Sequence, residues 1–232
     1  MRKTVAHRLK LGLLAACVAF LAWQGWYVGW VLWWKHFNPG TTHFMSLRLA
    51  ELRARNPQAE LSHQWVPYAK LSVNLKRAVV AAEDDKFVDH EGFDWEGMQK
   101  AIEKNQKEGK VVAGGSTISQ QLAKNLFLSA SKTPWRKVQE AIITVWLELF
   151  WDKRRILEVY LNSVEWGEGI FGAEAAARHY YNVSASALGP EQAARLAVML
   201  PAPRKYEKHP YSPFMDARTQ AILGRMQYSE LP

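Results

Sequence analysis

The stretch from residue 11 to residue 34 carries no charged side chain, and it constrains this chain more than any other feature. As an α-helix rising about 1.5 Å per residue, it would reach roughly 36 Å, which is enough to cross a bilayer core. Four basic residues and no acidic one precede it, and such a flank stays in the cytoplasm. We therefore expect a cytoplasmic tail at 1–10, a transmembrane helix at 11–34 and the remainder outside the cytoplasm.

Two other interpretations of this stretch were weighed against an uncleaved anchor. A cleaved signal peptide has an apolar region of about 7–15 residues followed by a small-residue cleavage site, and this stretch is longer and lacks that site. The sequence Leu-Ala-Ala-Cys at 14–17 is similar to a lipoprotein processing box, but the apolar run continues well beyond it. Five tryptophans between residues 23 and 34 suit the membrane–water interface, so the anchor is the favoured interpretation.

After the anchor we expect a linker and membrane-proximal segment at 35–60 and one folded domain at 61–232, a length that can bury a sizeable core. The chain has 30 Lys and Arg against 22 Asp and Glu, a formal charge of +8, which suits an anionic substrate or a membrane surface. Outside the cytoplasm it is poorly placed to meet nucleic acid, so we expect none as a partner. A single cysteine, Cys17, excludes a disulfide framework and a cysteine-rich zinc site.

The domain is predicted to be all-α with at most a short hairpin, because no stretch alternates convincingly between apolar and polar residues. Apolar steps of three and four predict one helix from Tyr68 to an acidic end at residues 83–85. A capping-box spacing predicts a helix start at Thr117. Thr133, followed by proline, begins a long helix whose apolar stripe we expect to be buried. That stripe consists of Trp135, Val138, Ile142, Val145 and Leu149.

Three successive carboxylates, Glu83, Asp84 and Asp85, stand at a helix C-terminus, where the helix dipole disfavours negative charge. The dipole and the crowding of like charges raise carboxyl pKa values, which suits proton transfer near neutral pH. A solvated acidic helix end closed by Lys86 explains the same pattern, and spacing alone favours that simpler explanation. His90 in the next loop is expected to position the acidic turn rather than to transfer a proton.

The sequence Gly-Gly-Ser-Thr at 114–117 opens a predicted helix, and free N–H groups at a helix start attract anions such as phosphate. Lys124 and Arg136 follow, so a cationic cradle for a pyrophosphate is one interpretation, and an ordinary capped helix is the other. Glu140 lies one helical turn after Arg136. It forms either a surface ion pair or a second carboxylate beside an anion-binding arginine.

Taken together, these segments resemble the glycosyltransferase family that polymerises peptidoglycan from lipid II. The matches to the motifs of that family lie, in the family's order, at residues 83–92, 115–121 with 124–125, 136–140, 153–162 and, slightly altered, 191–197. The chain stops at Pro232, without room for a transpeptidase domain, so it is similar to the monofunctional enzymes of the family. The resemblance implies a lysozyme-like helical domain of two lobes.

The resemblance also implies a reaction and roles for residues. A growing glycan on polyprenyl pyrophosphate is the donor, lipid II is the acceptor, and the new β-1,4 bond forms with inversion. Glu83 is implied as the general base, Lys124 and Arg136 as cations at the departing pyrophosphate, and Glu140 as a second catalytic carboxylate. Mg²⁺ or Mn²⁺ at Glu140 is an optional cofactor, and none is obligatory. The remaining implied substrate-binding residues are Asp84, Phe87, His90, Gly115, Ser116, Thr117, Gln121 and Asn125.

By the same resemblance, the protein is a single-pass protein of the bacterial cytoplasmic (inner) membrane with a periplasmic catalytic domain. Its implied partners are lipid II, the lipid-linked glycan strand and the membrane, and other cell-wall synthesis proteins are left open. Residues 126–128 and Trp135 are expected either at the lipid surface or in the core. A lytic enzyme with one acidic Glu and a non-catalytic scaffold are the rival functions, and neither needs the cationic cradle.

Overall fold

The computed structural model describes residues 2–110, 114–131 and 133–232, and it divides into two compact units, Met1–Asn38 and Pro39–Pro232. The first unit is a single long helix, α1 (Arg2–His36). Its segment Lys10–His36 has a mean hydropathy of 1.6. Among the described residues it is the one helix that is long and apolar enough to cross a membrane. This is consistent with a single-pass anchor.

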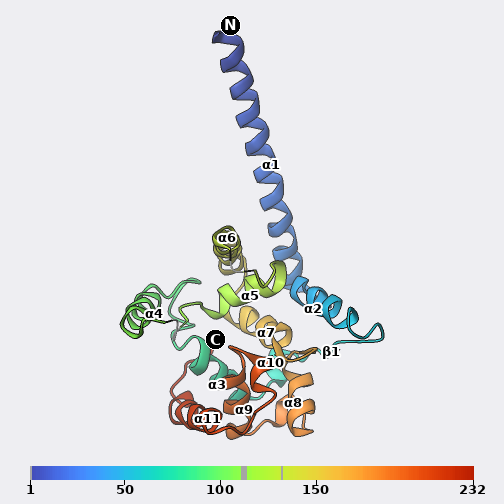
Figure 1. Cartoon of the computed structure of the whole chain (residues 1–232), viewed down its shortest axis with the longest axis vertical. Coiled ribbons are helices and arrows are strands. Elements are labelled where there is room, and N and C mark those ends of the chain that lie inside the picture. Colours follow the sequence, from blue (N-terminus) through green and yellow to red (C-terminus); the bar gives the residue numbers. More distant parts are fainter. Residues whose placement is uncertain (1, 111–113, 132) are drawn as a thin grey trace. The chain divides into compact units, whose positions relative to one another are not determined.

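The regular structure of the second unit is mainly helical (Figure 1). Its helices are α2 (His43–Arg53), α3 (Val73–Glu83), α4 (Trp95–Glu108), α5 (Ile118–Phe127), α6 (Pro134–Phe150), α7 (Lys153–Ser163), α8 (Ala173–Tyr181), α9 (Pro190–Met199), α10 (Pro203–Tyr206) and α11 (Pro213–Met226), with 3₁₀ turns η1 (Tyr68–Lys70) and η2 (Ala185–Ala187). Three short strands, β1 (Ser62–His63), β2 (Glu165–Gly167) and β3 (Ile170–Phe171), form a sheet in the order β1-β3-β2. Strand β1 is parallel to β3, and β2 and β3 form an antiparallel hairpin. The predicted all-α class is confirmed.

Helix starts follow the capping residues that the sequence provides. The Thr117 hydroxyl accepts from the Gln120 N–H, and the Gln120 side chain accepts from the Thr117 N–H, which completes the expected capping box of α5. At α6 the Thr133 hydroxyl accepts from the N–H of Arg136, with proline at the first helical position. The two helices that carry most of the predicted cationic residues therefore begin where the sequence indicates.

The core has two centres that meet near the end of α3. Helix α3 packs against α9 and α11, while α5 packs against α2, α6 and α7 (Figure 1). Leu75 and Val79 on α3 and Leu122 on α5 are completely buried, and each such side chain stabilises the fold by about 1.5–3 kcal/mol relative to exposure. Hydrogen bonds from Gln121 to Glu83 and from the Ile118 N–H to Asp84 hold the C-terminal end of α3 close to α5.

The expected burial of the apolar stripe on α6 was wrong. Trp135 is 59% exposed and Leu149 is 64% exposed, Val138 and Val145 are exposed as well, and Ile142 is half-buried. Instead, α6 buries the face that carries Glu140, Ile143, Thr144 and Leu147. The helix has apolar residues on both faces, and the face with the carboxylate packs toward α5. By contrast, Leu126, Phe127 and Leu128 are buried, as the core alternative expected.

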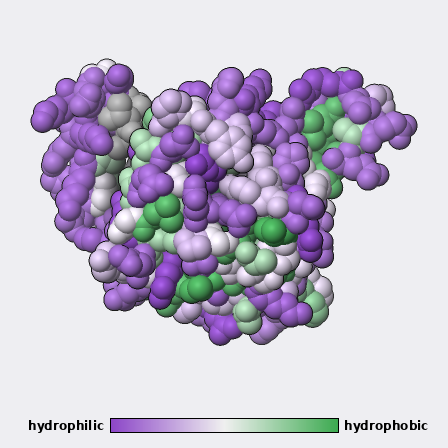
Figure 2. Space-filling view, turned by 90° about the horizontal axis from the view of Figure 1, so that it is seen from below, coloured by the Kyte–Doolittle hydropathy of each residue, from purple (hydrophilic) through white to green (hydrophobic). Residues whose placement is uncertain are grey.

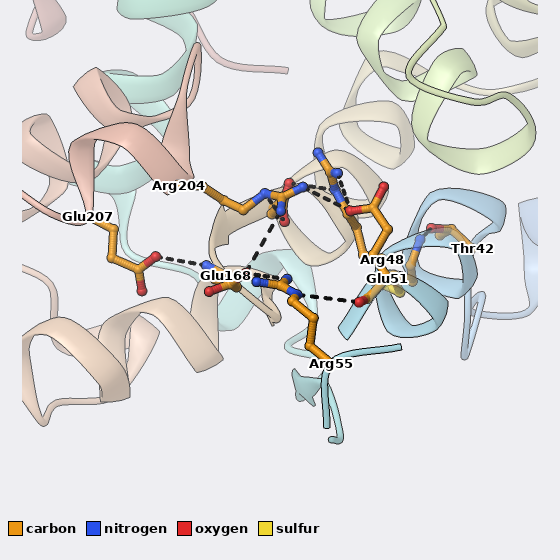
Figure 3. Close-up of polar contacts among 9 residues, drawn as sticks. Thr42, Arg48, Glu51, Arg55, Glu168, Arg204 and Glu207 are labelled. Atoms are coloured by element: carbon orange, nitrogen blue, oxygen red, sulfur yellow. Dashed lines mark hydrogen bonds and ion pairs between the residues drawn. The ribbon is translucent and has the colours of Figure 1, made fainter. Parts of the chain in front are cut away.

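An ion-pair network connects α2 to the β2–β3 hairpin and to α10 (Figure 3). Arg48 Nε lies 3.2 Å from an oxygen of Glu165, whose carboxylate is almost completely buried. Arg204 on α10 lies 3.1 Å from Glu51 of α2 and 3.6 Å from Glu165. Burial raises the pKa of Glu165, and both guanidinium groups oppose that rise. The network therefore fixes α2 against the rest of the domain.

Candidate active site

The end of α3 places Glu83 in a hydrogen bond with α5. Gln121 Nε2 donates to Glu83 Oε2 over 2.7 Å. Burial of the carboxylate raises the pKa of Glu83, and the Gln121 bond and the nearby Lys124 charge partly oppose that rise. The raised pKa was expected from crowded like charge and the helix dipole. The direction is confirmed, but the main cause is desolvation, and the charge of Asp84 adds only a smaller contribution.

Asp84, the residue that follows α3, joins the acidic turn to the start of α5. Its Oδ2 accepts from the N–H of Ile118 and its Oδ1 accepts from Nε2 of His90, both over 2.9 Å. His90 Nδ1 in turn accepts from the Gly92 N–H over 3.1 Å. Because Nδ1 accepts and Nε2 donates, this arrangement fits the neutral imidazole. His90 holds the turn in place and faces Asp84, not Glu83.

Gly92 closes the acidic turn at a position that accepts no side chain. Its φ of +87° is unfavourable for other residues, and a Cβ there would lie 2.8 Å from the Thr144 side chain and 2.9 Å from that of Glu148. Its carbonyl accepts from the Thr117 hydroxyl over 2.7 Å. The turn that carries Glu83 is thus fixed to both α5 and α6.

Glu140 lies at the centre of a cationic cluster on α6, and its side chain is only 4% exposed. One oxygen pairs with Arg136 NH1 at 2.5 Å and the other pairs with Lys137 Nζ. Lys137 Nζ also donates to Ser116 Oγ over 3.0 Å, which connects α6 to the glycine-rich turn. Lys137 was not among the site residues predicted from the sequence. Its spacing of three residues from Glu140 was the available signal.

Lys124 interacts electrostatically with both predicted catalytic carboxylates. Burial lowers the pKa of Lys124, whereas the charges of Glu140 and of Glu83 both raise it. The neighbouring Arg136 and Lys137 lower it. Charges act strongly only over short distances in a protein, so Lys124 lies within the field of both acidic groups. The charges of Glu83, Glu140 and Arg136 thus all act on Lys124, and the single cleft predicted for the four residues stays a prediction.

A pocket of about 330 Å³ opens beside Glu83. It is lined by the acidic turn at 83–85, the glycine-rich turn at 114–117, the start of α4 and Arg225 of α11. Phe87 and Asn125 are buried, with 0% and 3% exposure, and do not line this pocket. Of the substrate-binding residues expected from the sequence, Gly115 and Ser116 line the pocket and are partly exposed, whereas Asp84 and Thr117 line it but are buried.

The residues around Glu140 do not fit a divalent metal. Both of its oxygens already pair with positively charged groups, and those charges repel a cation. Among the described residues, no group of three or more His, Cys, Asp or Glu side chains could hold a metal ion. The cluster is instead suited to an anionic ligand such as a diphosphate.

Comparisons with known proteins show the family of this chain. Residues 50–227 match the family model described as Transglycosylase. This chain belongs to the transglycosylase family. Three relatives named biosynthetic peptidoglycan transglycosylase come from Dechloromonas aromatica, Aromatoleum aromaticum and an Azoarcus species. They are 62%, 63% and 61% identical over 99%, 95% and 99% of this chain and 100%, 95% and 99% of their own lengths.

Membership of the family confirms the enzyme class and the lysozyme-like helical fold expected from the sequence. The family and the names of these relatives support peptidoglycan glycosyltransferase activity, that is, polymerisation of glycan chains for cell-wall synthesis. The lytic and scaffold alternatives have no comparable support.

Proposed function

We propose that this transglycosylase joins lipid II units into glycan strands, with Glu83 as the general base. The observation that carries the proposal is a path of polar contacts from Glu83 through Gln121 and Ser116 to Lys137 of the cationic cluster. A proton acceptor and an anion-binding cluster therefore lie next to each other. Polymerisation from a pyrophosphate donor needs both, because a hydroxyl must lose a proton while a diphosphate leaves.

In the proposed step, Glu83 takes the proton from the 4-hydroxyl of the lipid II sugar. That oxygen forms a bond to the anomeric carbon of the glycan strand, and the bond from this carbon to the pyrophosphate breaks. The electron pair leaves with the polyprenyl pyrophosphate, and the α-linked donor becomes a β-1,4 product. The raised pKa of Glu83 brings the base closer to the working pH, which favours proton transfer.

Cations at the other end of the cleft support the departing group. Lys124, Arg136 and Lys137 provide positive charge, and partial burial keeps that charge effective. We assign Glu140 to holding Arg136 and Lys137 in place, because each of its oxygens bonds one of them. Ser116 belongs to the same group, since its hydroxyl accepts from Lys137.

The test is polymerisation of purified lipid II by the Glu83→Gln variant of the full chain. The amide keeps the shape of the side chain but cannot accept the proton, so we expect a rate loss of about 10²–10⁴-fold. Glu103→Gln on the exposed face of α4 is the matched control and should polymerise as the unaltered protein does. A Glu83→Gln protein with normal polymerisation would refute the base assignment. Degradation of mature glycan by the unaltered protein would instead favour a lytic enzyme.

We also propose that α1 anchors the protein in the cytoplasmic membrane with its basic end inside, and that the exposed apolar stripe of α6 contacts the lipid surface. The face formed by α8, α9 and α11 is mostly hydrophilic, with small separated hydrophobic areas (Figure 2). The stripe of α6 is apolar and exposed, which suits an interfacial helix. A lipid surface there would bring the cleft to its lipid-linked substrates.

Labelled cysteines in a Cys17→Ser background test the lipid contact. A dye on Val145→Cys of α6 should be quenched by a quencher carried on lipid tails, and a dye on Gln220→Cys of α11 should not. Both positions are exposed, so neither variant should disturb folding. Equal quenching at the two positions would contradict the proposed contact. Protease added outside spheroplasts should cut the domain if it faces outward.

A further inference from the structure

Tyr160 lies beneath the candidate base and has no role in the mechanism so far. It belongs to α7, and its side chain is completely buried. Its hydroxyl donates to Gln121 Oε1 over 2.8 Å, and Gln121 Nε2 donates to Glu83 Oε2 over 2.7 Å. A continuous chain of hydrogen bonds thus runs from the core to the carboxylate.

The hydroxyl of Tyr160 determines which way the Gln121 amide faces. The amide oxygen accepts from Tyr160, and this leaves the NH₂ group directed at Glu83, with the Ser116 carbonyl 3.5 Å from the same nitrogen. Turning the amide over would place its oxygen against the Glu83 carboxylate and against that carbonyl. Burial raises the pKa of Tyr160 well above its ordinary value, so the hydroxyl keeps its proton and remains a donor.

We propose that Tyr160 is a positioning residue that acts through Gln121 to keep Glu83 ionised and correctly oriented for proton abstraction. An N–H directed at a carboxylate stabilises the ionised form, and an oxygen directed at it stabilises the protonated form. The unprotonated form is the one that can accept a proton. This inference rests on the base role proposed for Glu83.

Other charged groups face Glu83 from the elements packed around it. Lys124 of α5 and Arg218 of α11 favour its ionised form, and Asp84 in the following turn opposes it. Asp85, Asp94 and Arg225 line the adjoining pocket. Changing Tyr160 to phenylalanine removes one oxygen atom and leaves all of these charges in place. A change in the pH profile of that variant therefore reports the hydrogen-bond chain.

The experiment measures lipid II polymerisation by the full-length Tyr160→Phe protein across pH. We expect the turnover number at neutral pH to fall roughly tenfold, as for the loss of one hydrogen bond in the reacting state, with KM nearly unchanged. The acidic limb of the pH profile should move to higher pH. Tyr68→Phe is the matched control, because Tyr68 is also buried and its hydroxyl donates to the Pro232 carbonyl over 3.0 Å. The control should keep the original profile.

A double substitution decides whether Tyr160 acts through Gln121. Gln121→Met, at a partly exposed position, should move the acidic limb in the same direction. Adding Tyr160→Phe to it should change the profile no further. An unchanged profile in the folded Tyr160→Phe protein, or additive effects in the double variant, would overturn the inference. If the Tyr160→Phe protein does not fold, an unchanged acidic limb of the pH profile in the Gln121→Met protein would overturn the inference instead. An active Glu83→Gln protein would instead refute the base role itself.

Discussion

Asp84→Asn should destabilise the turn next to Glu83, because an amide cannot accept both hydrogen bonds that the carboxylate accepts. The two oxygens of Asp84 accept from two different donors, the Ile118 N–H and His90 Nε2. Asparagine has a single acceptor atom at this place, so one of these donors must face an NH₂ group. A change of tautomer does not rescue His90, since its Nδ1 already accepts from Gly92.

The expected cost follows from one buried donor left without a partner. Asp84 is only 7% exposed, and an unsatisfied buried group costs about 1–3 kcal/mol. For a domain of this size, each 1 kcal/mol lowers Tm by roughly 2–4 °C. Thermal unfolding in detergent, followed by circular dichroism, should therefore show a decrease of roughly 2–12 °C. Polymerisation should fall as well, since the turn that holds Glu83 is no longer fixed to α5.

Asp94→Asn is the matched control for this change. One oxygen of Asp94 accepts from the Gly97 N–H at the start of α4, and asparagine caps a helix about as well as aspartate. We expect a change in stability of only a few tenths of a kcal/mol for the control. Equal Tm values for the Asp84→Asn and Asp94→Asn proteins would show that the two-donor argument is wrong.

Three further predictions follow from the charges. Lys124→Met should reduce polymerisation and move the acidic limb of its pH profile to higher pH, because the lysine charge lowers the pKa of Glu83. Polymerisation rates measured across pH check this. Arg48→Met should lower the free energy of unfolding, measured with denaturant, by about 1–3 kcal/mol, because the buried Glu165 carboxylate loses one of its positively charged partners. Arg55→Met removes an exposed ion pair with Glu168 and should lower it by less than about 1 kcal/mol. Polymerisation should persist in EDTA, because both oxygens of Glu140 already pair with basic side chains. If EDTA abolished the activity and Mg²⁺ restored it, the conclusion that this cluster does not fit a metal would be wrong.

Local signals predicted most of the fold. Capping residues placed the starts of α5 and α6 correctly, because a cap acts within one or two turns. Periodic apolar residues placed the end of α3 but not its start: residues 68–70 form the separate turn η1, and α3 begins at Val73, where the Ser72 hydroxyl caps it. The burial of α6 could not be predicted in this way. Its sequence is apolar on two faces, and only the packing against α5 decides that Thr144 turns inward while Val145 turns outward. Periodicity describes a helix but does not choose between two apolar faces.

Motifs located the site, but the contacts between motifs came only from the structure. The resemblance identified Glu83 and Glu140, which lie far apart in the sequence, and folding places both in the field of Lys124. Lys137 and Tyr160 were present in the quoted motifs without a role. Spacing could have paired Lys137 with Glu140, but the bond from Lys137 to Ser116 and the bond from Tyr160 to Gln121 join residues 21 and 39 positions apart, and no local spacing reveals such pairs. The structure therefore adds Lys137 and Tyr160, which contact Ser116 and Gln121 of the predicted site.

The raised pKa of Glu83 also predicts that the ionised carboxylate lowers the free energy of unfolding. A carboxyl whose pKa is higher in the folded state than in the unfolded chain destabilises the fold once it ionises. The cost is absent below the unfolded pKa, about 4.5, grows as pH rises through the window up to the folded pKa, and is complete above it. Glu83→Gln removes the charge, so its Tm should exceed that of the unaltered protein more at pH 7 than at pH 4.5.

Thermal unfolding at both pH values checks this expectation, with Glu103→Gln as the control that removes a carboxylate from an exposed position. The control should show little change at either pH, because exposed substitutions usually alter stability by less than about 0.5 kcal/mol. A Glu83→Gln protein that is less stable at pH 7 than the unaltered protein would mean that the Gln121 bond and the Lys124 charge outweigh the burial of the carboxylate. Glu83 would then be a stabilising ion pair, and the argument for a base tuned by desolvation would fail.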